Sequence, residues 1–263
     1  MIDSHCHLAD EVFHDDLEAV VARARAAGVD AALCVLDATN EAETSRAARV
    51  IAVWPAVRFS VGVHPHQAGQ FAGRVEEVES YLRGAIDRRS GTCAIGEIGL
   101  DYHYDYAPRD VQRQVFRSQI RVARDLGYPI VIHMREADDD TFAILSEGGE
   151  LPGAGVFHCF TGDVETARRA VDLGFYVSFS GIVTFRTAES VRAAAAVIPD
   201  DRLLIETDAP YLAPVPHRGK QNEPAWVGLV ADMVAGVRGV TSEELRRQTD
   251  AAFAALFRSG SAC

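Results

Sequence analysis

Apolar residues along the chain fall into eight short runs, each separated from the next by a longer segment of mixed polarity. The runs are apolar at nearly every position and end at Gly, Pro or polar residues, which is typical of strands buried on both faces. They predict strands at Met1–Cys6, Ala31–Leu36, Val57–Val63, Cys93–Leu100, Pro129–His133, Gly155–Cys159, Phe175–Ser180 and Arg202–Glu206.

The segments between these runs repeat apolar residues at helical spacing. Leu17, Val20 and Ala24 share one helical face in the first segment. Another helix is predicted to begin after Pro108, because proline suits the first turn of a helix, and to end at Gly127. Further helices are predicted at Glu41–Val53, Val75–Arg88, Asp138–Ser146, Val164–Leu173, Ala188–Val197, Pro224–Val237 and Ser242–Phe257.

Eight strands that alternate with helices are typical of an α/β protein with a (β/α)8 TIM barrel. The 263 residues suit such a barrel as one domain spanning 1–263. A doubly wound open sheet gives the same rhythm of strands and helices and is the alternative. The chain has no internal repeat or linker-like tract, so the pattern favours the single barrel.

Composition narrows the class of protein. Hydrophobic residues make up 48% and charged residues 24% of the chain, which is typical of a globular domain. No apolar run reaches membrane-spanning length and no signal segment opens the chain, so we expect a cytoplasmic protein without a membrane partner. The five cysteines lack paired spacing, which fits a reducing compartment. A net charge of −12 disfavours a broad nucleic-acid-binding face but permits a small, locally positive site.

Ionisable residues interrupt the apolar runs near the carboxyl ends of several predicted strands, where barrel enzymes place their chemistry. A lone histidine at a strand end is more often a hydrogen-bonded core residue than a ligand. Coincidence at five strand ends is a weaker explanation than one shared site. The metal-competent side chains at these ends are His5, His7, Glu97, His133, His158 and Asp208.

Four imidazoles and two carboxylates exceed the needs of one tetrahedral ion and suit two divalent cations. Glu97 lies inside an apolar run, and a buried carboxylate needs a cation nearby. The only lysine, Lys220, follows the last strand, so no carboxylated lysine is available as a bridge between the metals. Glu97 is therefore the predicted bridge. We expect His5 and His7 at the more buried ion, and His133 and His158 at the second.

Several stretches of the chain resemble the TatD family of metal-dependent hydrolases, a branch of the amidohydrolase-like barrels. The resemblance implies a (β/α)8 fold, a two-metal site, hydrolysis and the same six ligands. Its motifs are IDSHCHL at 2–8, GVHPHQA at 62–68, GEIGLDYHYD at 96–105, PIVIHMREA at 129–137, FHCFTGD at 157–163 and ETDAPYLAPVPHRGKQNEPAWV at 206–227.

The C-terminal helix departs from the family pattern. Ala252 and Ala255 stand where the family commonly has Asn and Arg before Leu-Phe. We expect this helix to close the outside of the barrel, so the departure bears on stability or a surface contact rather than on chemistry.

Two carboxylates are predicted to be catalytic. Glu97 would bridge the metals, and Asp208 would bind one metal and accept the proton of the attacking water. The alternative role of Asp208 is a cap of the following turn. Glu206 is predicted to support the ligands from behind, and Asn222 to orient the loop after the last strand.

Substrate contacts are predicted at His66, Arg218, Asp101 and Tyr102. Each has a structural alternative: a rigid turn for His66, a loop hydrogen bond for Asp101 and Tyr102, and packing over the barrel mouth for Arg218.

For two further stretches we favour a structural role over a functional one. Tyr104 and Tyr106 could stack nucleobases, but packing against the adjoining loop is favoured. Asp138, Asp139 and Asp140 are interpreted as capping a helix.

The resemblance favours a deoxyribonuclease that cleaves phosphodiesters at 3′ ends or in single strands of DNA. Ester hydrolysis of D-aminoacyl-tRNA is the second hypothesis, because the same activated water serves either bond. A third is a barrel scaffold without chemistry, which six intact ligands disfavour. Either nucleic acid would bind locally at the barrel mouth, and the sequence indicates no obligatory protein partner. The two cations could be zinc, manganese, magnesium, iron or nickel, and ligand softness alone disfavours magnesium.

Overall fold

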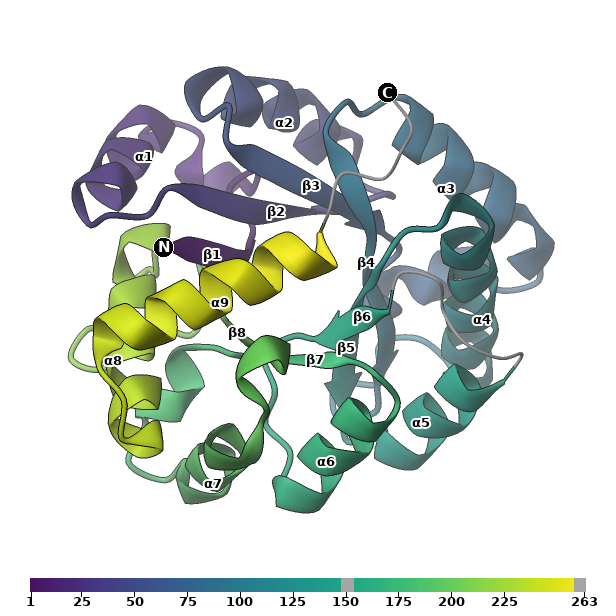
Figure 1. The fold of residues 1–263 in the computed structure, drawn as a ribbon. Helices are drawn as coiled ribbons and strands as arrows, with labels where there is room; N and C mark the ends of the chain where they lie inside the picture. The colour runs from purple at the N-terminus through teal and green to yellow at the C-terminus, as the bar shows by residue number, and fades with distance from the viewer. Residues whose placement is uncertain (148–153, 258–263) are drawn as a thin grey trace.

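Eight parallel strands form one sheet in chain order, β1 to β8 (Figure 1). The computed structural model describes residues 1–147 and 154–257, so Cys263 lies outside the described residues. Each strand pairs with the next in parallel, as the alternation of strands and helices predicts. The strands are β1 Ile2–Cys6, β2 Ala31–Asp37, β3 Val57–Gly62, β4 Thr92–Asp101, β5 Ile130–Arg135, β6 Gly155–Phe157, β7 Tyr176–Phe179 and β8 Leu203–Ile205.

Helices follow the strands and surround the sheet (Figure 1). Their apolar faces supply much of the core, since burial of apolar area is the main favourable term in folding. The α-helices are α1 Leu17–Ala26, α2 Glu41–Val53, α3 Val78–Asp87, α4 Arg109–Leu126, α5 Asp138–Ser146, α6 Val164–Asp172, α7 Glu189–Val197, α8 Val227–Arg238 and α9 Ser242–Leu256.

The sheet closes between β1 and the segment that follows β8. The backbone N–H of Asp208 donates to the carbonyl oxygen of His5 at 2.9 Å, and the N–H of His7 donates to that of Ala209 at 2.7 Å. Cys6 and Ala209 pair as an isolated parallel bridge. The closing backbone hydrogen bonds are therefore made by three predicted metal-ligand residues, and barrel closure fixes their relative positions.

A buried carboxylate adds to the closure from the side. Asp3 accepts hydrogen bonds from the backbone N–H of Thr207 at 2.9 Å and from its hydroxyl at 2.6 Å. Both residues are fully buried. Asp3 thus replaces the ladder hydrogen bonds that a longer β8 would have supplied, and a buried polar group of this kind is costly to leave unpaired.

Helix α9 takes a different position from the expected one. It lies across the end of the barrel where the strands begin, in front of the strands in Figure 1. Phe253 and Phe257 pack there with strand residues such as Leu33. The expectation that this helix closes the outside of the barrel is therefore wrong. Ala252 belongs to this packed cluster and is 3% exposed, whereas Ala255 faces solvent, so only the first departure from the family touches the core.

Several predicted boundaries shift at the catalytic end. Strands β6 and β8 stop earlier than predicted, so that His158 and Glu206 follow the strands instead of ending them. Cys159 and Asp208 have left-handed backbone conformations, with φ of 43° and 57°, and turn the chain away from the sheet. Strands β4 and β5 run longer than predicted. Periodicity alone does not report such turns.

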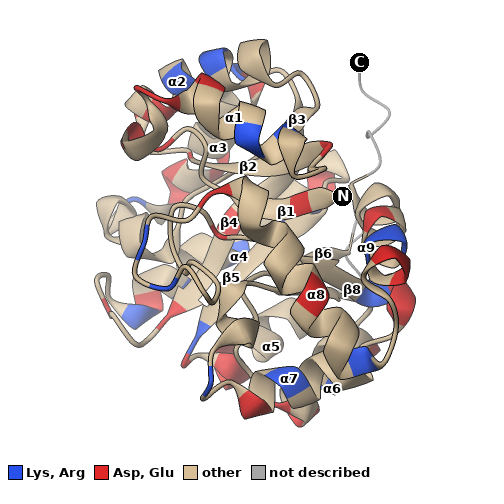
Figure 2. Cartoon of the chain, turned by 90° about the vertical axis from the view of Figure 1, so that its left-hand side faces the viewer, with Lys and Arg blue, Asp and Glu red and all other residues tan. Residues whose placement is uncertain are grey.

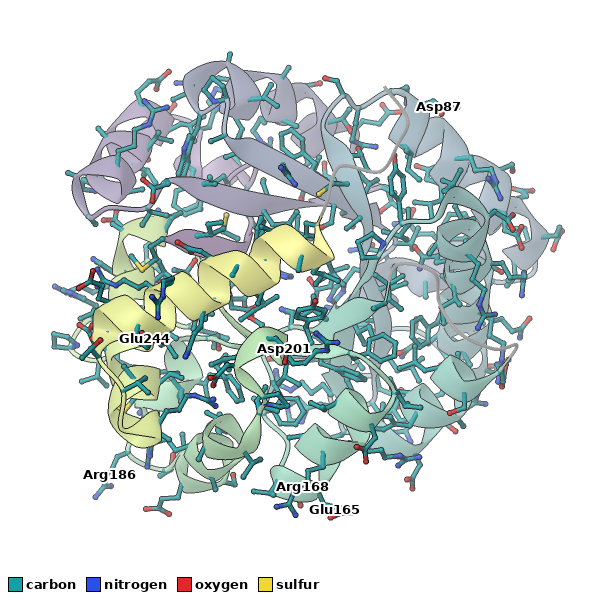
Figure 3. All side chains as sticks on the ribbon, in the orientation of Figure 1. Asp87, Glu165, Arg168, Arg186, Asp201 and Glu244 are labelled. Atoms are coloured by element: carbon teal, nitrogen blue, oxygen red, sulfur yellow. The ribbon has the colours of Figure 1, made fainter. Side chains whose placement is uncertain are left out.

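Charged side chains lie mainly on the outside. Lys, Arg, Asp and Glu occur on the surrounding helices and on the loops (Figure 2). The labelled Asp87, Glu165, Arg168 and Arg186 all project from the rim of the molecule (Figure 3). Among the described residues, no helix is both long enough and apolar enough to cross a membrane.

We expect Asp3→Ala to lower the free energy of unfolding by about 2–5 kcal/mol, because two buried donors of Thr207 lose their acceptor. Urea denaturation in the presence of a chelator measures this change without any metal contribution. Ser60→Ala is the matched control: Ser60 is fully buried on β3, and its hydroxyl has no hydrogen-bond partner within the described chain. Equal stability losses in the two variants would contradict the closing role of Asp3.

Candidate metal centre

Four ligand atoms converge beside the end of β1. The Nε2 atoms of His5 and His7 lie 3.3 Å apart, and they lie 3.6 and 3.4 Å from Oδ1 of Asp208. Oε2 of Glu97 lies 3.5 Å from Nε2 of His5. Ligands bonded tetrahedrally to one ion at ordinary bond lengths are separated by about 3.4 Å. The four side chains therefore fit one divalent cation.

The other carboxylate oxygen of Glu97 faces a second set of imidazoles. Oε1 lies 2.6 Å from Nδ1 of His133, 2.7 Å from Nε2 of His158 and 3.3 Å from Nε2 of His64. One oxygen of Glu97 thus faces each set, which is the arrangement of a carboxylate shared by two ions. All six predicted ligands lie in this cluster.

Local backbone structure places Glu97 between the two sets. The regular pairing of β4 with β5 is interrupted between Ile95 and Ile98, and such irregularities re-aim a side chain. Farther along, Gly99 pairs with His133 at a φ of 142°, and a side chain there would collide with the carbonyl oxygen of His133. The glycine therefore lets β4 bring Glu97 against the imidazole of β5.

Electrostatics keep Glu97 charged although its side chain is only 5% exposed. Burial alone would raise the pKa of Glu97, but the imidazoles of His158, His64 and His133 outweigh it and hold the pKa well below its ordinary value. Conversely, the pKa of His158 is raised well above its ordinary value, because Glu97 and Glu206 outweigh the effect of burial. The cluster therefore stabilises positive charge beside Glu97, as a cation site must.

Two imidazoles are held neutral instead. Burial, reinforced by neighbouring His158, lowers the pKa of His5. Burial lowers the pKa of His64 to about 4 despite the nearby Glu97 carboxylate. Neutral imidazole is the form that binds metal ions, so both side chains are ready to act as ligands at neutral pH.

The two halves of the cluster are similarly covered. The side chains of His5 and His158 are 0% and 5% exposed, whereas those of His7 and His133 are 24% and 17% exposed. These exposures do not separate the two halves, so the greater burial of the ion at His5 and His7 stays a prediction. Each half combines one enclosed imidazole with one that reaches the surface, so both are accessible from the barrel mouth.

Glu206 supports the ligands from behind, at the position predicted for it. Its Oε1 accepts the backbone N–H of Cys159 at 2.7 Å and lies 3.3 Å from Nδ1 of His158. Its Oε2 and Nδ1 of His5 are both buried, and neither has a hydrogen-bond partner in the described part of the chain. Ligand atoms of His5, His158 and Glu206 all lie within 4.8 Å of one another.

Asp101 holds two imidazoles in place. Its Oδ2 lies 2.9 Å from Nε2 of His66 and 3.0 Å from Nε2 of His133, and its Oδ1 accepts the backbone N–H groups of His103 and Tyr104. These hydrogen bonds outweigh burial and lower the pKa of Asp101. Asp101 is fully buried, so it orients His66 and His133 instead of offering an open substrate contact. The side chain of His66 is 26% exposed and reaches the mouth of the site.

Tyr102, a predicted substrate contact, is engaged elsewhere, whereas Arg218 rests on an aromatic ring and its substrate contact stays a prediction. The hydroxyl of Tyr102 donates to Asp140 at 2.5 Å, and Arg113 contacts the same carboxylate at 3.0 Å. The guanidinium of Arg218 lies 4.4 Å from the centre of the Phe185 ring. Asp140 therefore serves this network, and the cap position of α5 is Ala137, which makes no side-chain cap. All three carboxylates of this acidic stretch lie in the first turn of α5, where they suit the helix dipole as predicted.

Asn222 fixes the loop that carries the last ligand. Its amide nitrogen donates to the carbonyl oxygens of Thr207 at 2.7 Å and Tyr211 at 2.6 Å, and its Oδ1 accepts the N–H of Glu223 at 2.9 Å. The residue is fully buried. One side chain thereby binds the peptide unit before Asp208 and the carbonyl of Tyr211 three residues after it, a placement suited to the orienting role predicted for Asn222.

His64 and Asp3 are the site residues that sequence reasoning underrated or missed. His64 lies in the same GVHPHQA stretch as His66, and a short helical turn at Pro65–Phe71 leaves it facing Glu97. Asp3 lies two residues before His5, so on a strand its side chain points to the same side as those of His5 and His7, and this spacing could have indicated it.

A cavity of about 200 Å3 opens beside the cluster, lined by Met134, Glu136, Asp138, Phe157, His158, Phe160, Thr161 and Gly162.

Known proteins resemble this chain over almost its whole length. Residues 2–258 match the family model described as TatD related DNase. The chain is 45% identical to the uncharacterized metal-dependent hydrolase YcfH of Escherichia coli K12, over 98% of this chain and 95% of the relative. It is 36% identical to the 3'-5' ssDNA/RNA exonuclease TatD of Klebsiella pneumoniae strain 342, over 98% and 97% of the two chains.

A solved structure agrees with these matches. The crystal structure of the TatD homologue YJJV from Escherichia coli K12 matches with a TM-score of 0.87 and 28% identity, covering 98% of this chain and 97% of the other. The barrel, the cluster around Glu97 and the family match lead to one conclusion. The chain belongs to the TatD family and is a metal-dependent hydrolase built on a (β/α)8 barrel.

Proposed function

We propose that this hydrolase is a nuclease that cleaves phosphodiester bonds of single-stranded nucleic acid with two divalent cations. One observation carries the proposal: the two oxygens of Glu97 face separate sets of ligand atoms. Paired ions suit the in-line displacement of a phosphodiester. The relative named as a single-strand exonuclease supports the same substrate class.

The residues fit two cations, one held by His5, His7, Asp208 and Glu97, and the other by Glu97, His133 and His158. Ions bound there would supply Lewis acidity toward the scissile group and would lower the pKa of a water molecule. Nε2 of His64 lies 3.3 Å from Oε1 of Glu97, the oxygen that also faces His133. His64 could therefore complete the second set. Imidazole-rich sites favour zinc, manganese, iron or nickel over magnesium.

Asp208 is proposed to accept a proton from the attacking water. Its backbone is fixed by the hydrogen bond to His5 and by the loop anchored at Asn222. Interactions with His7 and His5 outweigh burial and lower the pKa of Asp208, so the carboxylate is ionised. A positioned, ionised carboxylate that remains 9% exposed can serve as a general base.

A second candidate is the hydrolysis of D-aminoacyl-tRNA. The cavity beside His158 includes the carboxylates of Glu136 and Asp138, and these suit the cationic amino group of an aminoacyl ester. The same water and the same base would serve this ester bond. Parallel assays of a single-stranded oligonucleotide and a D-aminoacyl-tRNA, with metal-replete protein, distinguish the two substrates.

We predict that Asp208→Asn lowers kcat for a single-stranded oligonucleotide by roughly 10²- to 10⁴-fold, because the amide cannot accept the water's proton. Elemental analysis should find most of the metal still bound. Asp172→Asn, at the exposed end of α6, is the control and should behave as wild type. Near wild-type turnover by Asp208→Asn would rule out the general-base role.

Replacing both His5 and His7 with Ala should remove one metal equivalent and the hydrolytic activity, since two of the four ligands proposed for that ion are lost. Inductively coupled plasma analysis counts the metal, and circular dichroism checks that the barrel is still folded. His14→Ala removes an exposed histidine and should retain both equivalents. Two equivalents in the His5/His7 double variant would contradict the two-ion account.

Glu206→Gln tests the support behind the ligands. Gln retains an acceptor oxygen for the N–H of Cys159, but it loses the negative charge that faces Nδ1 of His158 and replaces the unpartnered Oε2 with an amide donor. We expect metal affinity to fall by about 10- to 100-fold, as measured by calorimetric titration of metal-free protein. Glu165→Gln, a rim residue in Figure 3, is the matched control. Unchanged affinity in Glu206→Gln would show that its carboxylate does not orient the ligands.

A further inference from the structure

We infer that Tyr104 and Tyr106 form a stacking platform for an unpaired nucleobase beside the metal centre. The inference rests on the proposed nuclease function and assigns a base-binding subsite to it. The platform consists of these two tyrosines and the adjoining Arg135.

The two rings stack on each other and are open to solvent. Their centroids lie 5.4 Å apart with an interplanar angle of 15°, and Tyr104 and Tyr106 are 46% and 68% exposed. They do touch the adjoining loop through His66, as expected, but this contact leaves large parts of both rings uncovered. Exposing two large aromatic side chains side by side leaves apolar area in water, and such a patch marks a binding site more often than a solitary exposed residue does.

Short contacts connect the platform to the metal-ligand cluster. The ring of His66 stands edge-on to both tyrosines, with centroid distances of 4.8 Å to Tyr106 and 5.4 Å to Tyr104. His66 shares the carboxylate of Asp101 with His133, whose other ring nitrogen lies 2.6 Å from Glu97. A nucleotide whose phosphate lies at the metal centre can therefore place itself or its neighbour on the tyrosines.

Arg135 adds a positive charge to the platform. Its guanidinium lies 4.9 Å from the centre of the Tyr104 ring, and it forms no ion pair within residues 1–147 and 154–257. Arg109 makes a useful contrast, because it lies over Tyr102 but pairs with Asp105. A cation that rests on an aromatic ring without a carboxylate partner suits a phosphodiester backbone.

The geometry selects single strands. Stacking needs a base whose face is free, and any base offers such a face, so the platform reads exposure of the base and not its identity. Bases inside a duplex are already stacked and paired. The platform therefore favours single strands and frayed ends, and loss of one stacked base should weaken binding by about 5- to 150-fold.

The test compares two double variants. Tyr104→Leu with Tyr106→Leu removes the rings but keeps apolar side chains, and Tyr104→Phe with Tyr106→Phe keeps the rings. The metal-loaded enzymes are assayed on a single-stranded oligonucleotide and on the same strand with abasic residues near its 3′ end. We expect the Leu pair to lower kcat/KM for the natural strand by about 5- to 150-fold. The Phe pair should stay within about twofold, and neither pair should change cleavage of the abasic strand, which has no base to stack.

A spectroscopic measurement separates binding from turnover. In an Asp208→Asn background, an oligonucleotide carrying 2-aminopurine near its 3′ end should lose fluorescence on binding, and the Leu pair should abolish this quenching. Equal losses on natural and abasic strands, or quenching that the Leu pair leaves intact, would overturn the platform. A wild-type enzyme that cleaves neither strand would refute the nuclease proposal alone, since quenching sensitive to the Leu pair would still support the subsite.

Discussion

The buried carboxylate of Glu97 is the constraint on which the rest of the site depends. An ionised carboxylate that is only 5% exposed is unfavourable unless positive charge surrounds it. Here His133, His158 and His64 surround one oxygen, and His5 lies near the other. The carboxyl ends of β1, β4 and β5, and the segments after β3 and β6, must therefore reach the same level along the barrel axis. The barrel can be seen as the scaffold that holds four separate imidazoles against one charge.

Closure of the barrel and the geometry of the site depend on the same hydrogen bonds. Strand β8 is short, and the chain beyond it is joined to β1 through Asp208, Thr207 and Ala209. The hydrogen bonds that close the sheet thereby set the spacing between the ligands of β1 and the proposed base. The amide of Asn222 binds the carbonyls of Thr207 and Tyr211, which lie on either side of Asp208 in the chain. The loop beyond the proposed base is therefore part of the same hydrogen-bonded framework. Damage to closure would act on metal binding as well as on stability.

The sequence predicted the barrel and the six members of the cluster because both follow from local signals. Fully apolar strands report burial on two faces, and a charged residue inside such a run needs a partner. Contacts between residues far apart in the sequence were harder to predict from it. Tyr102 was predicted to contact substrate, yet its hydroxyl donates to Asp140. No sequence pattern states which of two neighbouring loops folds over the other.

The position of α9 was predicted wrongly, and the contact of His64 with Glu97 was not predicted, for a related reason. An amphipathic helix has one apolar face whether it covers the side of a barrel or its end, so its periodicity cannot tell these apart. Both histidines flank Pro65, and the turn that starts there decides which of them faces Glu97. In each case the residue type was informative, while its direction depended on backbone turns that single residues do not encode.

The protein carries a formal net charge of −12. Many of the arginines form ion pairs with carboxylates on the protein surface, as Arg117 does with Glu147 and Arg121 with Glu79. An acidic protein of this kind gains little from long-range attraction to a polyanion. Under the proposed nuclease function, recognition has to be local: charge compensation at the metal centre, Arg135 on its aromatic ring, and stacking that does not depend on the protein's net charge. On that proposal, an acidic barrel would engage an end or an unpaired segment of a negatively charged strand and would not wrap a duplex.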